Sequence, residues 1–414
     1  MKGVFVILDG LGDLPHRALN NQTPLEAAET PNLDFFATNG KLGQMYSVKK
    51  NYAPSSDEAI LSIFGNDYEK IPRSQLEAKG EDLELSKGDL ALRVNFATID
   101  DLENKNVLDR RAGRTITSKE SKKLAKKLNK INIGVDFEFV PSVQHRAILV
   151  LRGNYSENIS ENDQTYSNKD AKEAEKVVDF EPTDKKEISQ KTADILNEFV
   201  EKAHKILKKH PVNKKREKRG LMPANYLLMR SPGNRVPRLK KHKKWLSTAY
   251  MPLEAGFSEL SEMKTMTRKY PKLRSMDVYK NLWNAMKKYC KFSLKKLKKH
   301  YDEKDYAYIH IKETDLPGHD NKPHVKKEML EYLDEKFFKK LRKMTEKDKK
   351  LQVVVTGDHS TPCKLKRHSA HPIPVLFYDR KSPEKEKQFS EKASQRGKLG
   401  KFLGKELFKK AGFK

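Results

Sequence analysis

Residues 353–359, which read VVVTGDH, constrain the fold of this chain more than any other stretch of its sequence. The short β-branched run predicts a buried strand, and Gly357 allows the backbone to turn sharply and to pass close to a ligand. Asp358 and His359 then offer an oxygen and a nitrogen ligand at the carboxyl end of the strand, where open α/β sheets place their sites. The pattern favours an α/β fold with a metal site, although an aspartate is also a common helix cap and a histidine a common surface residue.

Two further apolar runs end in a similar way. Residues 2–8 form a compact apolar run that is followed by Asp9. Residues 306–312 form another, which is followed by Asp315 and His319, and this spacing can place both side chains on one side of a turn or helix. We therefore expect ligands from several strands to meet at one edge of a sheet, although Asp9 alone is also typical of a turn before glycine.

Two serines, Ser55 and Ser56, lie at a predicted helix start. The free N–H groups and the dipole of a helix N-terminus favour phosphate, and a serine hydroxyl bound to a cation can lose its proton near neutral pH. Ser56 is therefore a candidate nucleophile. The competing interpretation is an ordinary serine helix cap, which is the more common arrangement.

The character of the sequence changes from about residue 72 to residue 222. Within this segment Arg110, Arg111 and Arg114 lie within five residues of one another, directly after Asp109. Guanidinium groups in such a cluster suit bidentate binding of a phosphate or carboxylate, and Asp109 would move a proton or orient an arginine. A solvated basic face is the alternative interpretation.

Loop, helix and strand signals follow in the second half of this region. Polar residues 154–168 predict a loop, and residues 226–230 predict a strand that ends on Arg230. Residues 202–219 are strongly basic and begin as a predicted helix that Pro211 ends. Their charge would suit a nucleic acid, but no aromatic residues are interleaved for stacking on bases.

The composition limits the class of protein. A chain of 414 residues suffices for two domains, or for one large α/β domain that carries an insertion. Its 85 Lys and Arg against 57 Asp and Glu leave a net charge of +28, which indicates a nucleic acid or an anionic small molecule as partner, or a solvated lysine-rich surface. Two cysteines make no disulfide framework, and no apolar run approaches the roughly 20 residues of a membrane span. We expect a cytoplasmic protein that enters no membrane.

Seven candidate ligands are far apart in the sequence, yet nearly all of them follow a predicted strand or begin a predicted helix. They are Asp9, Ser56, Asp315, His319, Asp358, His359 and His368. Oxygen and imidazole ligands in this number suit two divalent ions, with Mn²⁺ or Mg²⁺ favoured by the carboxylates and Zn²⁺ or Co²⁺ compatible with the histidines. Two such ions clamp a phosphoryl group in line, which predicts phosphoryl transfer.

The chain resembles the alkaline phosphatase superfamily and, within it, the cofactor-independent phosphoglycerate mutases of archaeal type. The similarity extends over nearly the whole chain. The metal motifs carry the resemblance to the superfamily, and the motifs DRRAGR at 109–114 and NFAT at 95–98 narrow it to the mutases. Other matching motifs are LDG at 8–10, TPLEAA at 23–28, PSSD at 54–57, HRA at 145–147, HIK at 310–312, TGDHSTP at 356–362 and HS at 368–369.

The resemblance implies a fold and a domain organisation. The fold class would be α/β, with an alkaline-phosphatase-like core whose mostly parallel sheet is flanked by helices. Residues 1–71 and 223–414 would form this metal-binding core, and residues 72–222 an inserted, smaller α/β lid domain that binds substrate. A lid of this kind excludes water, which is what separates a mutase from a phosphatase.

The resemblance also implies an activity and roles for single residues. The enzyme would be an isomerase that interconverts 3-phosphoglycerate and 2-phosphoglycerate in glycolysis and gluconeogenesis, without 2,3-bisphosphoglycerate and with no specific nucleic acid as partner. Ser56 would carry the phosphate, with Asp9, Ser56, Asp358 and His359 around one metal and Asp315, His319 and His368 around the other. Asp109 would reprotonate the substrate, which would be held by Arg110, Arg111, Arg114, Arg230 and Lys312.

Two other functions remain open at this point. The chain departs from the family pattern at Ser55, Glu58 and Ala255, where the family has glycine, a polar residue and lysine. A phosphohydrolase or phosphonate-processing enzyme of the same superfamily would use the same metals with water as the final acceptor. A basic RNA-associated protein with relic metal motifs would bind RNA in a salt-sensitive way that survives chelation.

Overall fold

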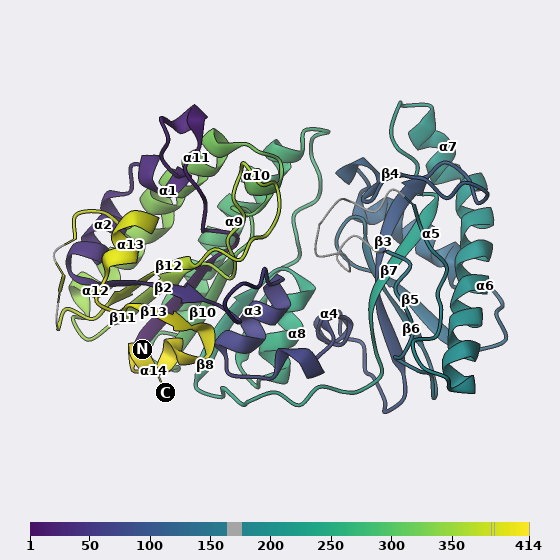
Figure 1. The fold of residues 1–414 in the computed structure, drawn as a ribbon, viewed down its shortest axis with the longest axis horizontal. Coiled ribbons are helices and arrows are strands. Elements are labelled where there is room, and N and C mark those ends of the chain that lie inside the picture. Colours follow the sequence, from purple (N-terminus) through teal and green to yellow (C-terminus); the bar gives the residue numbers. More distant parts are fainter. Residues whose placement is uncertain (164–175, 382, 385, 414) are drawn as a thin grey trace.

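The computed structural model describes residues 1–163, 176–381, 383–384 and 386–413. The chain folds into two lobes, each built on a sheet of its own, and both termini lie in the larger lobe (Figure 1). The loop expected over residues 154–168 is described as far as residue 163, and its remaining residues lie outside the described part of the chain.

The larger lobe contains an eight-stranded sheet in the described residues, with the order β13-β2-β12-β11-β1-β10-β8-β9. Most neighbouring pairs are parallel, and only β12 runs antiparallel to its two neighbours. This confirms the expectation of a mostly parallel sheet. The strands are β1 (Gly3–Leu8), β2 (Gly40–Tyr46), β8 (Trp245–Ala249), β9 (Lys264–Thr267), β10 (Tyr306–Ile311), β11 (Gln352–Thr356), β12 (Ile373–Tyr378) and β13 (Lys401–Leu403).

The central strands β11, β1 and β10 correspond to the three apolar runs that the sequence singles out. Their registers pair Leu8 with Ile311 and Ile7 with Thr356, so the three strands end at the same edge of the sheet. Every residue of β1 is buried, because the sheet is covered on both faces. Continuous apolar runs are the sequence pattern that such doubly covered strands require.

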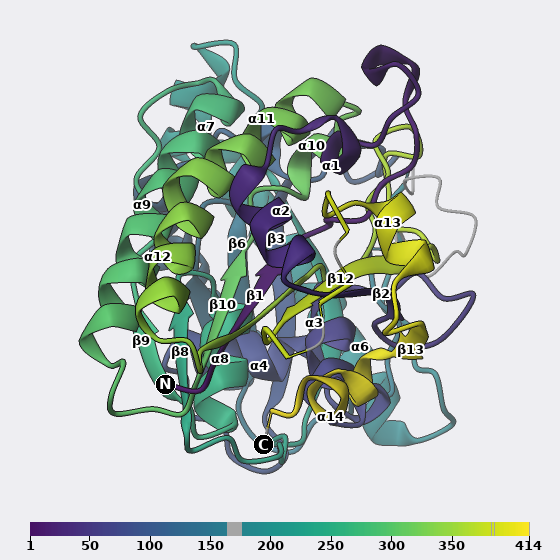
Figure 2. The same cartoon turned by 90° about the vertical axis from the view of Figure 1, so that its left-hand side faces the viewer.

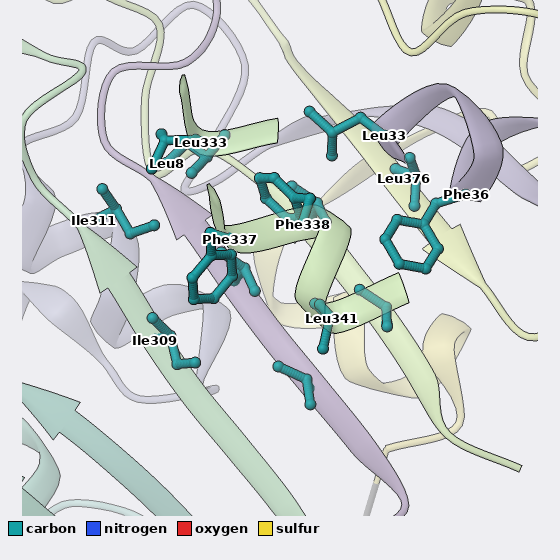
Figure 3. Close-up of a cluster of buried hydrophobic side chains, with 14 of the residues drawn as sticks. Leu8, Leu33, Phe36, Ile309, Ile311, Leu333, Phe337, Phe338, Leu341 and Leu376 are labelled. Atoms are coloured by element: carbon teal, nitrogen blue, oxygen red, sulfur yellow. The ribbon is translucent and has the colours of Figure 1, made fainter. Parts of the chain in front are cut away.

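One face of this sheet is covered by helices from the first and last thirds of the chain. Figure 2 shows α9, α11 and α12 lying over the strands. Figure 3 shows Phe337 and Phe338 of a π-helical turn (Asp334–Phe338) in one buried cluster with Leu8 and Ile309 of the sheet. The covering helices are α2 (Pro31–Thr38), α9 (Val278–Lys299), α11 (Pro323–Leu333), α12 (Lys339–Lys347) and α13 (Glu391–Arg396), with the short α1 (Pro24–Ala27) and α10 (Leu316–His319) near the strand ends.

The opposite face is covered by α3 (Ser56–Ile63), α8 (Pro252–Leu260) and α14 (Leu407–Ala411). Local sequence explains several helix starts. Thr23 caps α1 with a capping box, and α1 and α2 both begin with a proline, a residue that suits the first helical position. The described helices do not include one that combines the length and the apolar character needed to cross a bilayer.

The smaller lobe is built on an antiparallel sheet in which β3 pairs with β4, β6 and β7, and β6 pairs with β5. Helices α5, α6 and α7 pack on one face of this sheet. The elements are β3 (Leu90–Ile99), β4 (Val107–Asp109), α5 (Ser118–Leu128), β5 (Phe137–Pro141), β6 (Arg146–Leu151), α6 (Glu187–Lys209), α7 (Pro211–Glu217) and β7 (Tyr226–Gly233).

The pairing of β7 places the end of the smaller sheet beyond an expected boundary. The core was expected to resume at residue 223, but β7 pairs with β3 from Ala97↔Tyr226 to Ala91↔Gly233 and so belongs to the smaller sheet. The reason is that the chain completes this sheet before it returns to the larger lobe. The smaller sheet therefore extends to Gly233.

Helix α4 (Arg73–Gly80) lies between the lobes and packs closely on α8 of the larger one. A Cβ on Gly256 would lie 1.8 Å from the carbonyl oxygen of Leu76, and a Cβ on Gly80 would lie 2.0 Å from that of Pro252. The two helix backbones are therefore in direct contact, which only glycine permits at these two positions. On its other side α4 packs against β3 and β7.

Candidate functional site

The candidate site lies where β1, β10 and β11 end. Asp9 directly follows β1, and Asp358 follows β11 after one glycine. The backbone N–H of Gly10 donates to Asp358 Oδ1 at 3.0 Å, and Thr314 Oγ1 donates to the carbonyl oxygen of Asp9 at 2.6 Å. Gly10 has φ +62°, and a Cβ there would lie 2.7 Å from Asp315 Oδ1, so a larger residue would obstruct the site. The three strand ends are thus bound to one another.

Asp9, His310 and Asp358 form a first group of potential metal ligands. His310 Nε2 lies 3.6 Å from Asp9 Oδ2 and 3.5 Å from Asp358 Oδ2. The ligand atoms of the three residues lie within 4.8 Å of one another, and all three side chains are buried. His359 stands beside this group, with its Nε2 3.2 Å from Asp9 Oδ1 and 3.4 Å from Asp358 Oδ2.

Asp315, His319 and His368 form a second group. His319 Nε2 lies 3.2 Å from Asp315 Oδ2, and His368 Nε2 lies 3.9 Å from Asp315 Oδ1. The rings of His359 and His368 stack with centroids 3.6 Å apart, so the two groups adjoin. Asp9, Asp315 and His359 also qualify as a set of ligand atoms within 4.8 Å. All the histidines and aspartates that the sequence predicts as ligands therefore meet in one place.

Hydrogen bonds to the other ring nitrogen orient each of the three predicted histidines. His368 Nδ1 lies 2.8 Å from the carbonyl oxygen of Pro54, and His319 Nδ1 lies 3.1 Å from that of Lys366. His359 Nδ1 lies 2.9 Å from Thr361 Oγ1, which itself donates to Asp315 Oδ1 at 2.7 Å. These contacts leave Nε2 of each ring toward the carboxylates, the arrangement found around protein-bound metals.

The protonation states of three of these residues, Asp9, Asp315 and His368, also suit cation binding. Burial raises the pKa of Asp9, but the charge of Lys312 and the hydrogen bonds of His310 and His359 together outweigh it and hold that pKa well below its usual range. At Asp315 burial again raises the pKa and the charge of His319 lowers it. The pKa of Asp315 is also held well below its usual range. Burial and the charge of His359 lower the pKa of His368 to about 3. Ionised carboxylates and a neutral imidazole are the forms that bind metal.

The residues present fit two divalent cations. Among the described residues, Asp358 Oδ2 and His310 Nε2 are buried polar atoms that lack a hydrogen bond of normal geometry. A buried polar atom of this kind is costly unless an ion or another ligand satisfies it. Carboxylate oxygens and imidazole nitrogens in two adjoining groups match the preferences of Mn²⁺, Mg²⁺ or Zn²⁺.

Ser56 is the first residue of α3 and is 7% exposed. Its Oγ lies 3.4 Å from His359 Nε2 and accepts a hydrogen bond of 3.1 Å from Lys312 Nζ. Lys312 also pairs with Asp9 and, at 3.2 Å, with Glu254 Oε1. The serine hydroxyl therefore faces the predicted ligands together with a cationic side chain, as a metal-activated nucleophile requires.

A buried ion pair supports the loops that carry these ligands. Lys326 Nζ donates to Asp13 Oδ2 at 2.7 Å and to the carbonyl oxygen of Thr361 at 3.1 Å. The N–H of Cys363 donates to Asp13 Oδ1 at 2.9 Å. Both charged side chains are fully buried. The loop after His359 is thus fixed to the first loop of the chain.

The predicted substrate residues of the smaller lobe occupy three different settings. Arg110 and Arg230 both pair with the buried carboxylate of Asp163. Arg230 Nε lies 3.2 Å from Asp163 Oδ2. Arg114 donates to Asp320 of the larger lobe at 3.1 Å and 3.2 Å. Burial is the main cause that lowers the pKa of His145 and that of Arg146. The charge of Arg111, which lies close to both, lowers each pKa further. Asp163 and Asp320 neutralise part of the charge of these arginines. Only the remaining positive charge of the smaller lobe therefore faces the metal ligands.

Asp109 shapes the arginine loop itself. Its Oδ1 accepts the backbone N–H of Arg111 at 2.7 Å and that of Gly113 at 2.8 Å. Ala112, Gly113 and Arg114 all have positive φ values, an unusual run for residues other than glycine. The guanidinium of Arg216, which is 1% exposed, donates to the carbonyl oxygens of Ala112 and Thr115 and so holds the run.

Sequence reasoning missed several residues of this site. His310 lies inside an apolar strand, yet it shares a face with Lys312 two residues later, and this period-2 spacing was a usable signal. Glu254, Asp163 and Asp320 meet their basic partners only through the tertiary fold. No local pattern marks them.

Comparison with known proteins gives one consistent family. Residues 37–213 match the family model described as 2,3-bisphosphoglycerate-independent phosphoglycerate mutase. A protein of that name from Thermococcus kodakarensis is 40% identical to this chain, over 98% of the chain and 95% of the relative. Another, from Methanocaldococcus jannaschii, is 36% identical over 99% of the chain and 96% of the relative.

Solved structures agree with the sequence relatives. A Pyrococcus horikoshii protein of 29% identity superimposes with a TM-score of 0.74, covering 100% of this chain and 98% of the other. A cofactor-independent phosphoglycerate mutase from Thermoplasma acidophilum, 28% identical, gives a TM-score of 0.58 over 99% and 98% of the two chains. The α/β fold class expected from the resemblance is confirmed.

Proposed function

Since this chain belongs to the 2,3-bisphosphoglycerate-independent phosphoglycerate mutases, we propose that it interconverts 3-phosphoglycerate and 2-phosphoglycerate through a phosphoserine at Ser56. One observation carries the proposal. Ser56 Oγ lies within 3.4 Å of both His359 Nε2 and Lys312 Nζ, where two groups of metal ligands adjoin. A phosphoryl group on this oxygen would thus lie beside the Lys312 ammonium group and the proposed metal ions.

Two divalent ions, Mn²⁺ or Mg²⁺, are the proposed cofactors. Asp9, Ser56, Asp358 and His359 would hold one ion, with His310 as a further candidate, and Asp315, His319 and His368 would hold the other. When bound, such ions lower the pKa of a ligated hydroxyl and neutralise phosphoryl oxygens. No 2,3-bisphosphoglycerate is required, because the phosphate would be carried by the enzyme.

The chain's own residues divide the remaining work. Lys312 Nζ, which donates to Ser56 Oγ, would bind a phosphoryl oxygen and stabilise the charge that develops during transfer. Arg110, Arg111, Arg114 and Arg230 would bind the anionic glycerate from the smaller lobe. Asp109 would move the proton between the two substrate hydroxyls through Oδ2, since both of its backbone N–H partners bind Oδ1.

The two-lobe arrangement supports a mutase over a hydrolase. The proposed lid is the inserted segment of residues 72–222, extended by β7 to Gly233. The contact between Arg114 of this lobe and Asp320, next to the ligand His319, lies at the site. Contact there would keep water from the phosphoserine until the glycerate has turned and taken the phosphate back. The reaction would serve glycolysis and gluconeogenesis.

A coupled assay tests the proposal. Purified protein is incubated with 3-phosphoglycerate in the presence of Mn²⁺, in the presence of Mg²⁺ or after chelation. The reaction is then stopped, and the 2-phosphoglycerate formed is measured by its conversion to phosphoenolpyruvate with excess enolase and added Mg²⁺. We expect metal-dependent isomerisation with no release of inorganic phosphate. Phosphate released in step with substrate loss would instead indicate a phosphohydrolase, and absence of turnover with either metal would refute the mutase assignment.

A further inference from the structure

A buried chain of alternating charges connects the helix of Ser56 to the smaller lobe. Asp57, which follows Ser56, accepts a hydrogen bond of 3.1 Å from Arg73 Nη1. Arg73 Nε donates to Glu77 Oε1 at 2.6 Å, and Arg93 Nε lies 2.9 Å from the same oxygen. Arg93 belongs to β3 of the smaller sheet, whereas Arg73 and Glu77 belong to α4 between the lobes.

Glu77 is the central member of this chain. Its side chain is 5% exposed, and it is the one carboxylate that contacts both arginines among the described residues. Burial raises its pKa, but the charges of Arg93 and Arg73 outweigh burial and lower the pKa to about 2. Glu77 is therefore ionised at neutral pH, and its negative charge balances two guanidinium groups that would otherwise repel each other.

The two arginines border the proposed substrate site. Arg93 pairs across the strands with Arg230, and the charge of Arg93 helps to lower the pKa of His145. Arg73 reaches the residue next to Ser56, on the other side of the proposed site. An anion between the lobes would therefore meet Arg73 near Ser56 and Arg93 near the arginines of the smaller lobe.

We propose that Glu77 is a positioning residue that holds Arg73 and Arg93 on opposite sides of the lobe boundary, so that both bind the anionic substrate beside Ser56. Glu77 itself touches no reacting atom. Glu77 acts through the arginines. Its position is fixed because the backbone of α4, the helix that carries it, lies directly on α8 at Gly80 and Gly256. The inference rests on the proposed function for the identity of the substrate.

Removal of the charge from Glu77 would leave two buried guanidinium groups without their shared partner. Removing one member of a buried charge pair is costly, mostly because the remaining charge is left uncompensated. The arginines would then turn away from each other, and the site would lose its preorganised pair of anion ligands. The loss would fall first on substrate binding.

The test compares Glu77→Gln with Glu81→Gln, a matched control at the end of the same helix. Glu81 accepts a hydrogen bond from Ser142 Oγ and thus also contacts the smaller lobe, but it contacts neither Arg73 nor Arg93. Active, folded protein is first quantified by circular dichroism and by bound Mn²⁺. We expect Glu77→Gln to raise the KM for 3-phosphoglycerate about 10- to 100-fold with a smaller change in kcat. Glu81→Gln should stay within about two-fold of the wild type.

Two further measurements separate positioning from general loss of structure. Arg73→Gln combined with Glu77→Gln should be little worse than either variant alone, because both act through one arrangement. Calorimetric binding of 3-phosphoglycerate to the holoenzyme should weaken in Glu77→Gln by the same factor as KM.

An unchanged KM and an unchanged binding constant in folded Glu77→Gln would overturn the inference, as would an equal effect of Glu81→Gln. Calorimetry measures the binding of 3-phosphoglycerate and therefore tests the role of Glu77 even if the wild type does not isomerise this substrate. Wild-type protein that binds 3-phosphoglycerate without isomerising it would refute the proposed function and not the role of Glu77.

Discussion

Ser56→Ala is the substitution that separates catalysis from folding most sharply. Ser56 Oγ has two polar neighbours, Lys312 Nζ at 3.1 Å and His359 Nε2 at 3.4 Å. The start of α3 depends on a different side chain, because Glu58 Oε2 accepts both the backbone N–H of Ser55 at 2.7 Å and its hydroxyl at 2.9 Å. The substitution therefore removes the nucleophile without removing the helix cap.

The expected magnitudes follow from these contacts. Loss of one long and one ordinary hydrogen bond costs about 1 kcal/mol or less, and alanine recovers a few tenths through its helix propensity. The free energy of unfolding should thus change by less than about 1 kcal/mol. Turnover should fall by at least about four orders of magnitude. The nucleophile and the groups that activate it act together, so loss of the nucleophile alone removes nearly all of the catalysed rate.

The assay follows isomerisation of 3-phosphoglycerate with enolase in excess, beside urea unfolding and Mn²⁺ binding. Mass spectrometry of protein quenched with substrate should find a phosphorylated Ser56 peptide in the wild type and none in the variant. Ser55→Ala is the control, and it should cost about 1 kcal/mol of stability while keeping turnover within a few-fold. Turnover above roughly 1% of the wild-type value in folded Ser56→Ala would refute the nucleophile assignment.

Three further predictions concern the metals, a buried ion pair and the response to acid. Asp315→Asn should lower bound Mn²⁺ from about two ions to about one per chain, measured by elemental analysis after dialysis. The control Asp320→Asn should retain both ions. Equal losses of Mn²⁺ in the two variants would argue against the second site. Lys326→Met should cost about 3–5 kcal/mol in urea unfolding because its buried carboxylate partner is left uncompensated, whereas Lys327→Met, which breaks a partly exposed pair, should cost less than about 1 kcal/mol; similar costs for both would contradict this reasoning. Because the pKa of Glu77 falls from 4.5 to about 2 on folding, its contribution is present above pH 4.5 and is lost as the pH falls toward 2. Glu77→Gln should therefore lower the unfolding free energy by about 3 kcal/mol at pH 7, and the difference from the wild type should shrink steadily below pH 4.5; a difference that does not vary with pH would contradict it.

The strand ends could be predicted from the sequence because each signal there is local. An apolar run that stops at an aspartate indicates both a strand and the residue at its carboxyl end, and β1 and β11 end as expected. The convergence of Asp9 with Asp358 then follows from adjacent parallel strands, with no further information. The same holds for helix starts such as Thr23, whose capping box is written within four residues.

Other parts of the site could not be predicted because their partners are distant in the sequence. Helix α4 reads RSQLEAKG, which indicates a solvated helix, yet Glu77 is buried because the helix lies between two lobes. Asp163 lies in a polar loop and receives Arg110 and Arg230 only in the folded chain. The smaller sheet extends past the expected boundary at residue 223 for the same reason, since only strand pairing assigns β7 to that sheet.

The glycine contacts between α4 and α8 determine where the two lobes can move. Helix backbones that touch at Gly80 and Gly256 cannot slide past each other, so α4, although it begins the proposed lid segment, would stay with the larger lobe if the lid moved. A rotation of the smaller lobe would then have to be taken up by the two crossing segments, residues 81–89 and 234–244, as a hinge. Glu77 and Arg93 lie on opposite sides of that hinge, and their ion pair is therefore a contact that lobe opening would stretch and closure would restore.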